Sequence, residues 1–445
     1  MPEAEVVRAA DIGGRAVGVA GALETAGLSP GDRLVLLIPG SGDYLATVIG
    51  ALRSGIVPVP LDPSLTEHER RPLLEDADAA LVIDSTAQLS ELVRQARRPA
   101  RALADPPRAR PMHYTSGTTG RPKGVYSGLL SDTDAAALLA DERDFWAIDA
   151  DDVHLVASPL HHSAPLRFSV TTLLSGGSVV LPGPFDARRW AAAVLEHRPT
   201  SAFVVPAHLT RLLEVGLPPT DSFRLLAHAG AACPDAVKRR TLEAFPRGSV
   251  WEFYGSTEGQ FTACRGEEWV QRPRTVGRAR PGRALRAEST GRLWCRAPAF
   301  ARFSYWRDAE RTAAAWRGEE FTVGDMGRVD EAGYVFVDGR RDDLVISGGV
   351  NVYPAEVESA LTELAGVEQV AVFGLPDERW GQRVCAVVVG DVGDGELSAW
   401  ASARLAPPKR PKQYFRLSDL PRTTTGKIRR RDLPAAVGFG DGSPR

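Results

Sequence analysis

Lysine is scarce in this chain of 445 residues, although basic residues are not. Only five of the 54 lysine and arginine residues are lysines, namely Lys123, Lys238, Lys409, Lys412 and Lys427. Arginine therefore serves wherever a generic positive charge is enough. A lysine kept in this background is a candidate for chemistry that the planar, permanently charged guanidinium group cannot perform.

Three further shortages exclude whole classes of protein. The four cysteines are too scattered for a zinc site or a redox pair, and lone cysteines suit a reducing cytoplasm. No run of about 18 apolar residues exists, and residues 1–10 do not read as a signal peptide, so we expect no membrane span. The formal net charge of −2 creates no field that would attract nucleic acid.

Short apolar runs alternate with helical segments in the first part of the chain. Residues 33–38, 56–59, 79–83 and 201–205 read as buried strands, and residues 44–53 read as a helix. This rhythm predicts a parallel sheet with crossover helices, and the chain length predicts two or three domains. Residues 93–111 are rich in arginine and proline and read as a surface linker.

The pattern changes twice further along the chain. From residue 275 to 337, strand-like pieces such as 291–295 and 334–337 alternate with turn residues and predict a small antiparallel unit. After Gly339 the segments 355–361, 367–373 and 383–389 read as helix, strand and strand. A compact α+β domain of about 100 residues is expected there.

The segment from Tyr114 to Gly124 (YTSGTTGRPKG) is the strongest chemical signal. Its glycines allow backbone N–H groups to approach an anion, and its hydroxyl groups and Lys123 add further phosphate ligands. The spacing differs from that of a Walker A loop. A solvated linker is the structural alternative, but such linkers rarely combine these residues.

This segment resembles the phosphate-binding motif of the adenylate-forming superfamily, which includes acyl-CoA synthetases. Five more segments resemble the family's motifs in family order: residues 254–258 (YGSTE), 322–325 (TVGD), 339–343 (GRRDD), 347–351 (SGGVN) and 421–427 (PRTTTGK). The resemblance implies an α/β fold. A large N-terminal domain of parallel α/β sheets with a small β-barrel unit, residues 1–340, would precede a mobile α+β domain, residues 341–445.

The resemblance also implies the residues of the site. Lys427, Thr257, Glu258 and His162 would take part in catalysis, with Glu258 as the Mg²⁺ ligand. Tyr254 would stack on adenine, and Asp325 and Arg340 would hold the ribose. The residues expected to contact ATP or coenzyme A are Thr115, Ser116, Gly117, Thr118, Thr119, Gly120, Lys123, Gly230, Ala231, Ala232, Tyr254, Gly255, Asp325, Arg340, Gly348 and Gly349.

Lys427 and the glycine pair serve different half-reactions in this interpretation. The ammonium of Lys427 would offset charge as a carboxylate attacks the α-phosphate. Gly348 and Gly349 would line a narrow channel for the thiol arm of coenzyme A. Asp342 resembles the hinge about which the small domain turns between the two steps.

The predicted acid has no α-amino group, because residues 160–162 (LHH) carry no carboxylate where amino-acid-activating relatives place one. Leu166, Phe168, Val170 and Leu173 follow this motif and favour an apolar acyl group, although core packing explains them equally well. His162 also has a structural alternative, a satisfied core histidine. His161 departs from the family, which usually has an aromatic residue there.

Two alternatives to a coenzyme A ligase are kept. Only 18 residues follow Lys427, so we expect the acceptor to diffuse in, and a separate acyl carrier protein could replace coenzyme A. Gly40, Ser41 and Gly42 weakly favour a dinucleotide-binding oxidoreductase, but a plain turn explains them better. The oligomeric state stays open, with a homodimer as one option.

Overall fold

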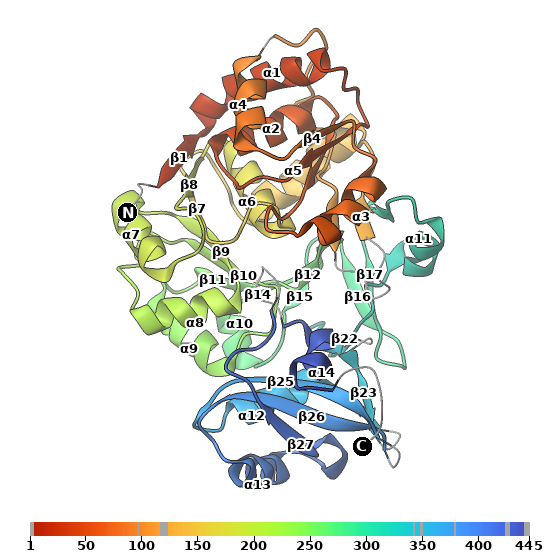
Figure 1. The fold of residues 1–445 in the computed structure, drawn as a ribbon. Coiled ribbons are helices and arrows are strands. Elements are labelled where there is room, and N and C mark those ends of the chain that lie inside the picture. Colours follow the sequence, from red (N-terminus) through yellow and green to blue (C-terminus); the bar gives the residue numbers. More distant parts are fainter. Residues whose placement is uncertain are drawn as a thin grey trace.

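The computed structural model describes residues 4–96, 98–115, 123–340, 343–347, 350–377, 380–422 and 428–439. For His68, Arg340 and Asn351 it describes the backbone alone. The fold is mixed α/β, with a large N-terminal part and a small C-terminal part, which is blue in Figure 1. In the described part of the chain no helix is both long and apolar enough to cross a membrane.

An eight-stranded sheet lies at the centre of the large part, in the order β1-β8-β7-β9-β10-β11-β14-β15. Its strands are β1 (Glu5–Arg8), β7 (Val153–Val156), β8 (Ser178–Leu181), β9 (Ser201–Val204), β10 (Leu225–His228), β11 (Val250–Glu252), β14 (Thr262–Arg265) and β15 (Arg278–Ala279). Strands β8, β7, β9, β10 and β11 are parallel to one another.

Helices connect the parallel strands, as such a sheet requires. They are α6 (Ser163–Leu174), α7 (Ala187–His197), α8 (Pro206–Val215) and α9 (Asp235–Ala244), each between two consecutive parallel strands. Helix α5 (Asp132–Phe145) precedes β7. Because all of these strands run the same way, the loops after β10 and β11 leave the same edge of the sheet.

A smaller parallel sheet forms the N-terminal part, in the order β3-β2-β4. Its strands are β2 (Arg33–Leu36), β3 (Val57–Pro60) and β4 (Leu81–Ile83), and its helices are α1 (Ala9–Thr25), α2 (Gly42–Arg53), α3 (Glu67–Ala77) and α4 (Thr86–Arg94). The predicted strands and the helix at residues 44–53 are confirmed. Ser41 caps α2, and the Gly42 N–H donates to Glu5, so a carboxylate of the chain itself lies at this helix start.

The predicted linker carries no helix or strand in its described residues between α4 and β5 (His113–Thr115). Strand β5 pairs with β6 (Lys123–Tyr126), which pairs with β18 (Ser304–Tyr305). The Thr115 and Lys123 backbones are partners in this ladder, so both ends of the phosphate-loop segment are fixed side by side.

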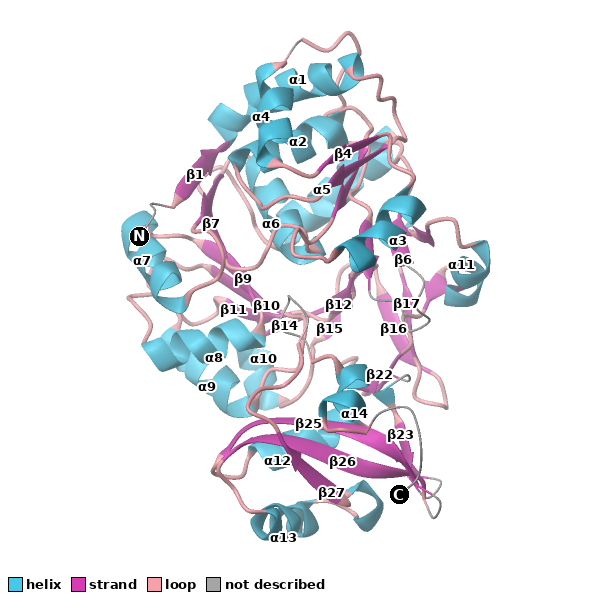
Figure 2. Ribbon diagram, viewed as in Figure 1, coloured by secondary structure: helices cyan, strands magenta, loops and turns pink. Residues whose placement is uncertain are grey.

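The predicted antiparallel unit follows β15. One sheet has the order β16-β17-β20-β19, and a separate pair joins β21 and β22. The strands are β16 (Ala284–Ala287), β17 (Leu293–Arg296), β19 (Trp316–Arg317), β20 (Glu320–Phe321), β21 (Asp325–Val329) and β22 (Val335–Arg340), with α11 (Ala309–Ala315) before β19. Figure 2 shows these short magenta strands beside the central sheet.

The C-terminal part is a five-stranded sheet covered by helices. It contains β23 (Val345–Ser347), β24 (Val350–Val352), α12 (Pro354–Thr362), β25 (Val367–Asp377), β26 (Gly381–Gly390), α13 (Asp394–Arg404), β27 (Gln413–Arg416) and α14 (Leu433–Ala436). Alternate residues of β25 and β26 enter two separate hydrophobic cores, one on each face. This confirms the predicted compact α+β unit.

Candidate active site

Thr257 and Glu258 lie at the tip of a very tight hairpin. Strand β12 (Gly255–Ser256) pairs with β13 (Gly259–Gln260), and only these two residues connect the strands. A Cβ atom on Gly255 would lie 2.5 Å from the Gly259 carbonyl oxygen, so glycine is required there. The sequence YGSTE thus fixes the two side chains through the close approach of its backbone.

Glu258 is buried and has three partners. Its Oε1 lies 2.8 Å from the Lys123 Nζ and accepts a 2.9 Å hydrogen bond from the Tyr305 hydroxyl, and its Oε2 accepts a 2.6 Å bond from Ser256. Burial alone would raise the pKa of Glu258, but the Lys123 charge and these hydrogen bonds together lower it. Glu258 is therefore a carboxylate at neutral pH, joined to the phosphate-loop lysine.

Lys123 is held by an aromatic ring as well as by a carboxylate. Its Nζ lies 4.3 Å from the centroid of the Tyr305 ring, a distance at which the ring's negative face attracts a cation. Lys123 and Tyr305 come from the paired strands β6 and β18, and Glu258 comes from the hairpin. Three segments distant in sequence thus meet at one ammonium group.

The residues predicted to hold adenosine also meet. The Tyr254 hydroxyl donates a 2.6 Å hydrogen bond to Oδ2 of Asp325, which is the first residue of β21. In the antiparallel pair β21–β22, Asp325 lies directly opposite Arg340, whose backbone alone is described. Tyr254 and Asp325, with Arg340 across the ladder, therefore form one local group, as two ribose contacts would require.

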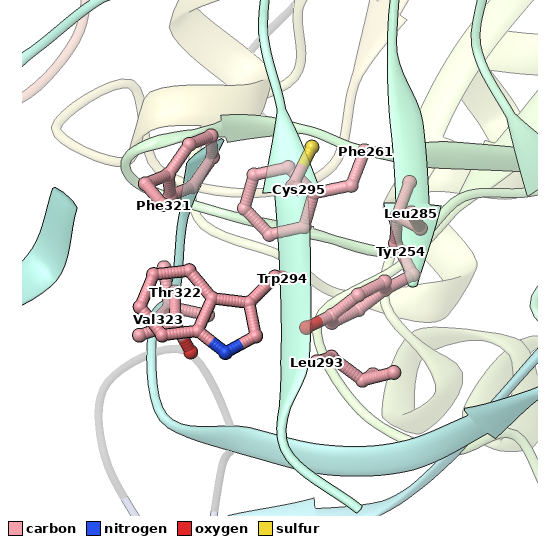
Figure 3. A pocket seen from close by; sticks show the side chains of 9 residues that line it. All are labelled: Tyr254, Phe261, Leu285, Leu293, Trp294, Cys295, Phe321, Thr322 and Val323. Carbon is pink, nitrogen blue, oxygen red and sulfur yellow. The ribbon is translucent and has the colours of Figure 1, made fainter. Parts of the chain in front are cut away.

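Tyr254 also forms one wall of a small hollow. Figure 3 shows the apolar and aromatic side chains around it, several of them carried by β16, β17 and β20. Its lining residues are Tyr254, Phe261, Leu285, Leu293, Trp294, Cys295, Phe321, Thr322 and Val323. The Tyr254 ring thus lies beside residues of the antiparallel unit. The Phe261 ring meets it edge-on, with the two ring centroids 5.1 Å apart.

His162 is the N-cap residue of α6 and is partly exposed, which argues against the alternative of a core histidine. The His161 and His162 rings are 4.1 Å apart, and the His161 Nε2 lies 3.8 Å from an Asp62 oxygen. Burial lowers the pKa of His161. Gly230, Ala231 and Ala232 are exposed and follow the carboxyl end of β10, where Gly230 has a φ of +96°.

The four apolar residues after His162 do not gather at one place. Leu166, Val170 and Leu173 belong to the hydrophobic core shared with the N-terminal sheet, and Phe168 belongs to an aromatic cluster on the central sheet. All four are buried. This is the core-packing alternative, so these side chains give no support to an apolar acyl group.

Several predicted site residues lie outside the described residues: Ser116, Gly117, Thr118, Thr119, Gly120, Gly348, Gly349 and Lys427, together with the hinge residue Asp342. The structure describes residues that border these segments. Arg422 and Ile428 form an antiparallel bridge, and the Arg429 N–H donates to the Pro421 carbonyl at 2.8 Å. The chain therefore enters and leaves the Lys427 segment at one place.

Arg430 fixes the downstream side of that segment. Its Nε donates to the Val372 carbonyl at 2.8 Å, its Nη1 donates to Asp343 at 3.3 Å, and its Nη2 donates to Glu358. Asp343 directly follows the predicted hinge residue. Arg430 thus connects the Lys427 segment to the hinge segment through partly buried ion pairs.

Sequence reasoning missed a buried network at the carboxyl ends of β10 and β11. The fully buried Lys238 Nζ contacts the His228 Nε2 and lies 3.3 Å from the Glu252 Oε2. Burial raises the pKa of Glu252, and burial followed by the Lys238 charge lowers the pKa of His228. His228 and Glu252 immediately precede the loops that carry Gly230 and Tyr254, and only the scarcity of lysine hinted at this network.

The donor chemistry around Glu258 fits a magnesium ion. Within the described ranges, no three His, Cys, Asp or Glu side chains converge to hold a metal ion. Mg²⁺ is commonly held by one or two carboxylates together with substrate phosphates and water rather than by a protein cage. A single ionised carboxylate beside the phosphate-loop lysine is such a site.

Comparison with known proteins agrees with this geometry. Residues 10–298 match the model of the AMP-binding enzyme family, and residues 356–427 match the model of the AMP-binding enzyme C-terminal domain. An indoleacetate–CoA ligase from Aromatoleum aromaticum is 31% identical, over 96% of this chain and 92% of that protein.

Two solved structures share the fold. ATP-bound MatB from Rhodopseudomonas palustris is 30% identical, with a TM-score of 0.85 over 96% of this chain and 93% of that one. O-succinylbenzoate coenzyme A synthetase from Bacillus subtilis, in complex with ATP and a magnesium ion, is 26% identical, with a TM-score of 0.84 over 95% and 94%.

The fold and the site define an AMP-forming enzyme of the acid–thiol ligase class. The chain belongs to the AMP-binding enzyme family. The two matched regions lie in the large and the small part of the molecule, so the family relationship extends to both.

Proposed function

We propose that this chain is an acyl-CoA synthetase, which activates a carboxylic acid with ATP and then transfers the acyl group to coenzyme A. The observation that carries the proposal is the assembly of Lys123, Glu258, Tyr254 and Asp325 at neighbouring positions. These residues come from three separate segments, and each supplies the chemistry that one part of Mg-ATP requires. Family membership supports the same reaction.

We assign the nucleotide and acid to residues 1–340 and the catalytic lysine to residues 341–445. Thr257, at the hairpin tip, is within the segment that presents Glu258, and its hydroxyl would donate to the α-phosphate. Asp325 would accept hydrogen bonds from the ribose. Mg²⁺, held by Glu258, would neutralise phosphate charge.

In the first half-reaction, a carboxylate oxygen of the acid forms a bond to the α-phosphorus while the bond to the pyrophosphate oxygen breaks. Two anions approach each other in this step. Lys123 would hold the departing phosphates, and the Lys427 ammonium would offset the charge that develops. The products are an acyl-adenylate and pyrophosphate.

In the second half-reaction, the thiol sulfur of coenzyme A bonds to the acyl carbon and the bond to the AMP oxygen breaks. The thiol proton is released to solvent. Gly348 and Gly349 would leave room for the pantetheine arm. Arg430 would keep the Lys427 segment and the hinge segment in a fixed relation while the small domain turns.

We further propose that the acid lacks an α-amino group and that the part of its acyl group next to the carboxyl is apolar. Ala164 and Val205 support this, because both are only partly buried and pack beside the aromatic cluster of Trp146 and Phe253. A cytoplasmic location is supported by the four cysteines, all of which are free thiols.

The decisive experiment measures the two half-reactions separately. ATP–pyrophosphate exchange over aromatic, fatty and polycyclic acids identifies the substrate, and mass spectrometry then detects thioester formation with coenzyme A alone. Thioester formed only when an acyl carrier protein is added would select the carrier-loading alternative. A failure to exchange with every acid tested would refute the proposal.

Two variants assign the small-domain residues. Lys427→Ala should lower exchange by about 100-fold or more yet leave thioester formation from supplied acyl-adenylate largely intact. Gly349→Leu should do the opposite, because its side chain would block the thiol channel. Lys412→Ala, another lysine of the small domain, is the matched control, and equal losses in both half-reactions would reject the assigned roles.

A further inference from the structure

Four arginines and two carboxylates gather around the end of α5. Arg283 donates to both oxygens of Asp141 at 2.9 Å, and the fully buried Arg280 lies 3.2 Å from Asp141 and 3.4 Å from Glu142. Arg167, on α6, lies 3.6 Å from the same Glu142 oxygen. Two carboxylates are therefore already shared among three guanidinium groups.

The fourth arginine, Arg110, has no carboxylate of its own among the described residues. Its Nη1 is buried there without a hydrogen-bond partner. Burial and the like charge of Arg167 lower the pKa of Arg110 to about 10, and Glu142 only partly opposes this. Arg110 is thus a partly buried cation, with one buried nitrogen and no partner for it, in a surrounding that already has an excess of cations.

His113, the first residue of β5, adds a second unpartnered group. Its Nε2 is also buried without a hydrogen-bond partner in the part of the chain that the structure describes. Burial, followed by repulsion from Arg167, His161 and Arg110, lowers the pKa of His113 to about 3. The imidazole is neutral at physiological pH, so it relieves none of the positive charge.

Buried charges are normally paired, because removing an unpaired ion from water costs several kcal/mol. The described residues leave this cluster with four guanidinium groups against two carboxylates. An anion brought by a ligand would complete it. That anion would also give the buried Nη1 of Arg110 the partner that it lacks among the described residues.

The cluster lies directly beside the reacting residues. Arg167 donates a 2.9 Å hydrogen bond to Ser163, the neighbour of His162. Arg280 donates to Gln260, two residues after Glu258. Ser163 also precedes Ala164, which contributes to the apolar wall of the acid site. A molecule whose carboxyl lies near His162 could therefore extend past Ala164 toward Arg167.

We propose that the acid activated by this enzyme carries a second anionic group at the end remote from the reacting carboxyl, and that Arg167 and Arg110 bind it. The substrate class is then a dicarboxylic acid, or a carboxylic acid with another distal anion, whose middle part is apolar. This inference rests on the proposed acyl-CoA synthetase function and specifies its substrate.

The test compares acids that differ only in the distal group. ATP–pyrophosphate exchange is measured with straight-chain monocarboxylic acids against diacids of equal length, and with benzoate against terephthalate. We expect at least one diacid to exceed its partner in kcat/KM by about tenfold or more, since a hydrogen bond to a charged group is worth at least about that factor. Arg167→Met and Arg110→Met should abolish this preference, and Arg167→Lys should retain part of it. Arg188→Met, an exposed position on α7, is the control.

Two further readouts separate binding from a structural role. Arg110→Met should leave the melting temperature unchanged or raise it, because it removes a partly buried charge without leaving a partner unpaired. A clear fall would mark Arg110 as structural and overturn the proposal. ATP affinity should not change, and a loss of ATP affinity as large as the loss of diacid affinity would identify the triphosphate as the anion instead.

The outcomes for the two proposals are distinct. Equal activity with both members of every acid pair overturns the anionic-substrate inference while the acyl-CoA synthetase function stands. A lack of exchange with acids of either kind, in protein that still binds ATP, overturns both. A diacid preference that disappears in both arginine variants but not in Arg188→Met supports the inference.

Discussion

Lys123 and Arg110 flank strand β5, one after it and one before it, yet their charges are compensated differently. Lys123 has a carboxylate at 2.8 Å and an aromatic ring beneath it. The Arg110 Nη1 is buried without a partner among the described residues, close to other arginines. The nucleotide side is thus complete without its ligand, whereas the acid side has a surplus of positive charge.

This difference teaches how each ligand must bind. In the proposed assignment, Mg-ATP would exchange existing contacts, because its phosphates and its metal would compete for groups that already hold each other. The acid would instead complete a charge balance that the described residues leave open. Binding on the nucleotide side would therefore be a substitution, and binding on the acid side an addition. Variants on each side can test this contrast.

Glu258→Gln should have the largest effect. It removes both the carboxylate that the structure places beside Lys123 and the proposed metal ligand, so adenylate formation should fall by about 100- to 1000-fold. Exchange measured over a Mg²⁺ series should show a raised metal requirement. Glu214→Gln, at an exposed position, is the matched control, and near-normal exchange in Glu258→Gln would remove Glu258 from the site.

Lys238→Met should be the most damaging change to stability. It leaves the buried Glu252 without its cation, which should cost about 3 kcal/mol of unfolding free energy. The double variant Lys238→Met, Glu252→Leu should recover most of it. Chemical denaturation checks both. Together with Arg110→Met, it contrasts a fully buried, paired cation with a partly buried one whose Nη1 lacks a partner among the described residues. If Lys238→Met left the free energy of unfolding unchanged, the Lys238 network and the Arg110 cluster would not differ in this respect.

Asp325→Asn should weaken nucleotide binding without stopping the chemistry. The amide cannot accept bonds from both ribose hydroxyls and from Tyr254 as the carboxylate can, so KM for ATP should rise about tenfold. The kcat value should change far less. Isothermal titration with ATP checks this, with the exposed Asp391→Asn as control, and an unchanged affinity would displace Asp325 from the ribose site.

Two buried histidines should make the free energy of unfolding depend on pH. The pKa of His113 is lowered to about 3 and that of His154 to about 4, so both are neutral when folded and take up a proton on unfolding below pH 6.5. Stability should therefore fall as pH drops from 6.5 toward 4, by about 1.4 kcal/mol per pH unit for each histidine. His113→Gln and His154→Gln should each flatten the slope, and an unchanged slope would show that the histidine concerned is not responsible.

Local patterns were sufficient for most of the fold. The apolar runs at residues 33–38 and 201–205 needed only hydrophobicity and length to be recognised as strands, because their surroundings do not alter that outcome. The YGSTE segment was marked by its resemblance to a family motif, but its tight hairpin was not predicted. The four residues after His162 were ambiguous for a physical reason, since a helix buried on most sides offers apolar side chains to a core and to a ligand alike.

Charge clusters could not be derived in this way. Arg110, Glu142, Arg167 and Arg280 are separated by 25 to 113 residues in sequence at each step, and no local periodicity reports that they converge. The sequence offers only one weak sign of such a cluster, which is a charged residue within a segment whose other residues are apolar. Lys238 carried one extra hint, the rarity of lysine, which marked it without indicating its partners.

The contact between Lys123 and Glu258 has a consequence for the resting enzyme. An ammonium and a carboxylate that neutralise each other present little net attraction to stray anions or cations. Inorganic phosphate alone would pair with the ammonium and leave the carboxylate without a partner. A divalent ion alone would pair with the carboxylate and leave the ammonium without one. In the proposed assignment, only a ligand that brings both signs at once, a metal with its polyphosphate, would satisfy the two together. The pair would then protect the empty site from the ordinary salts of the cell.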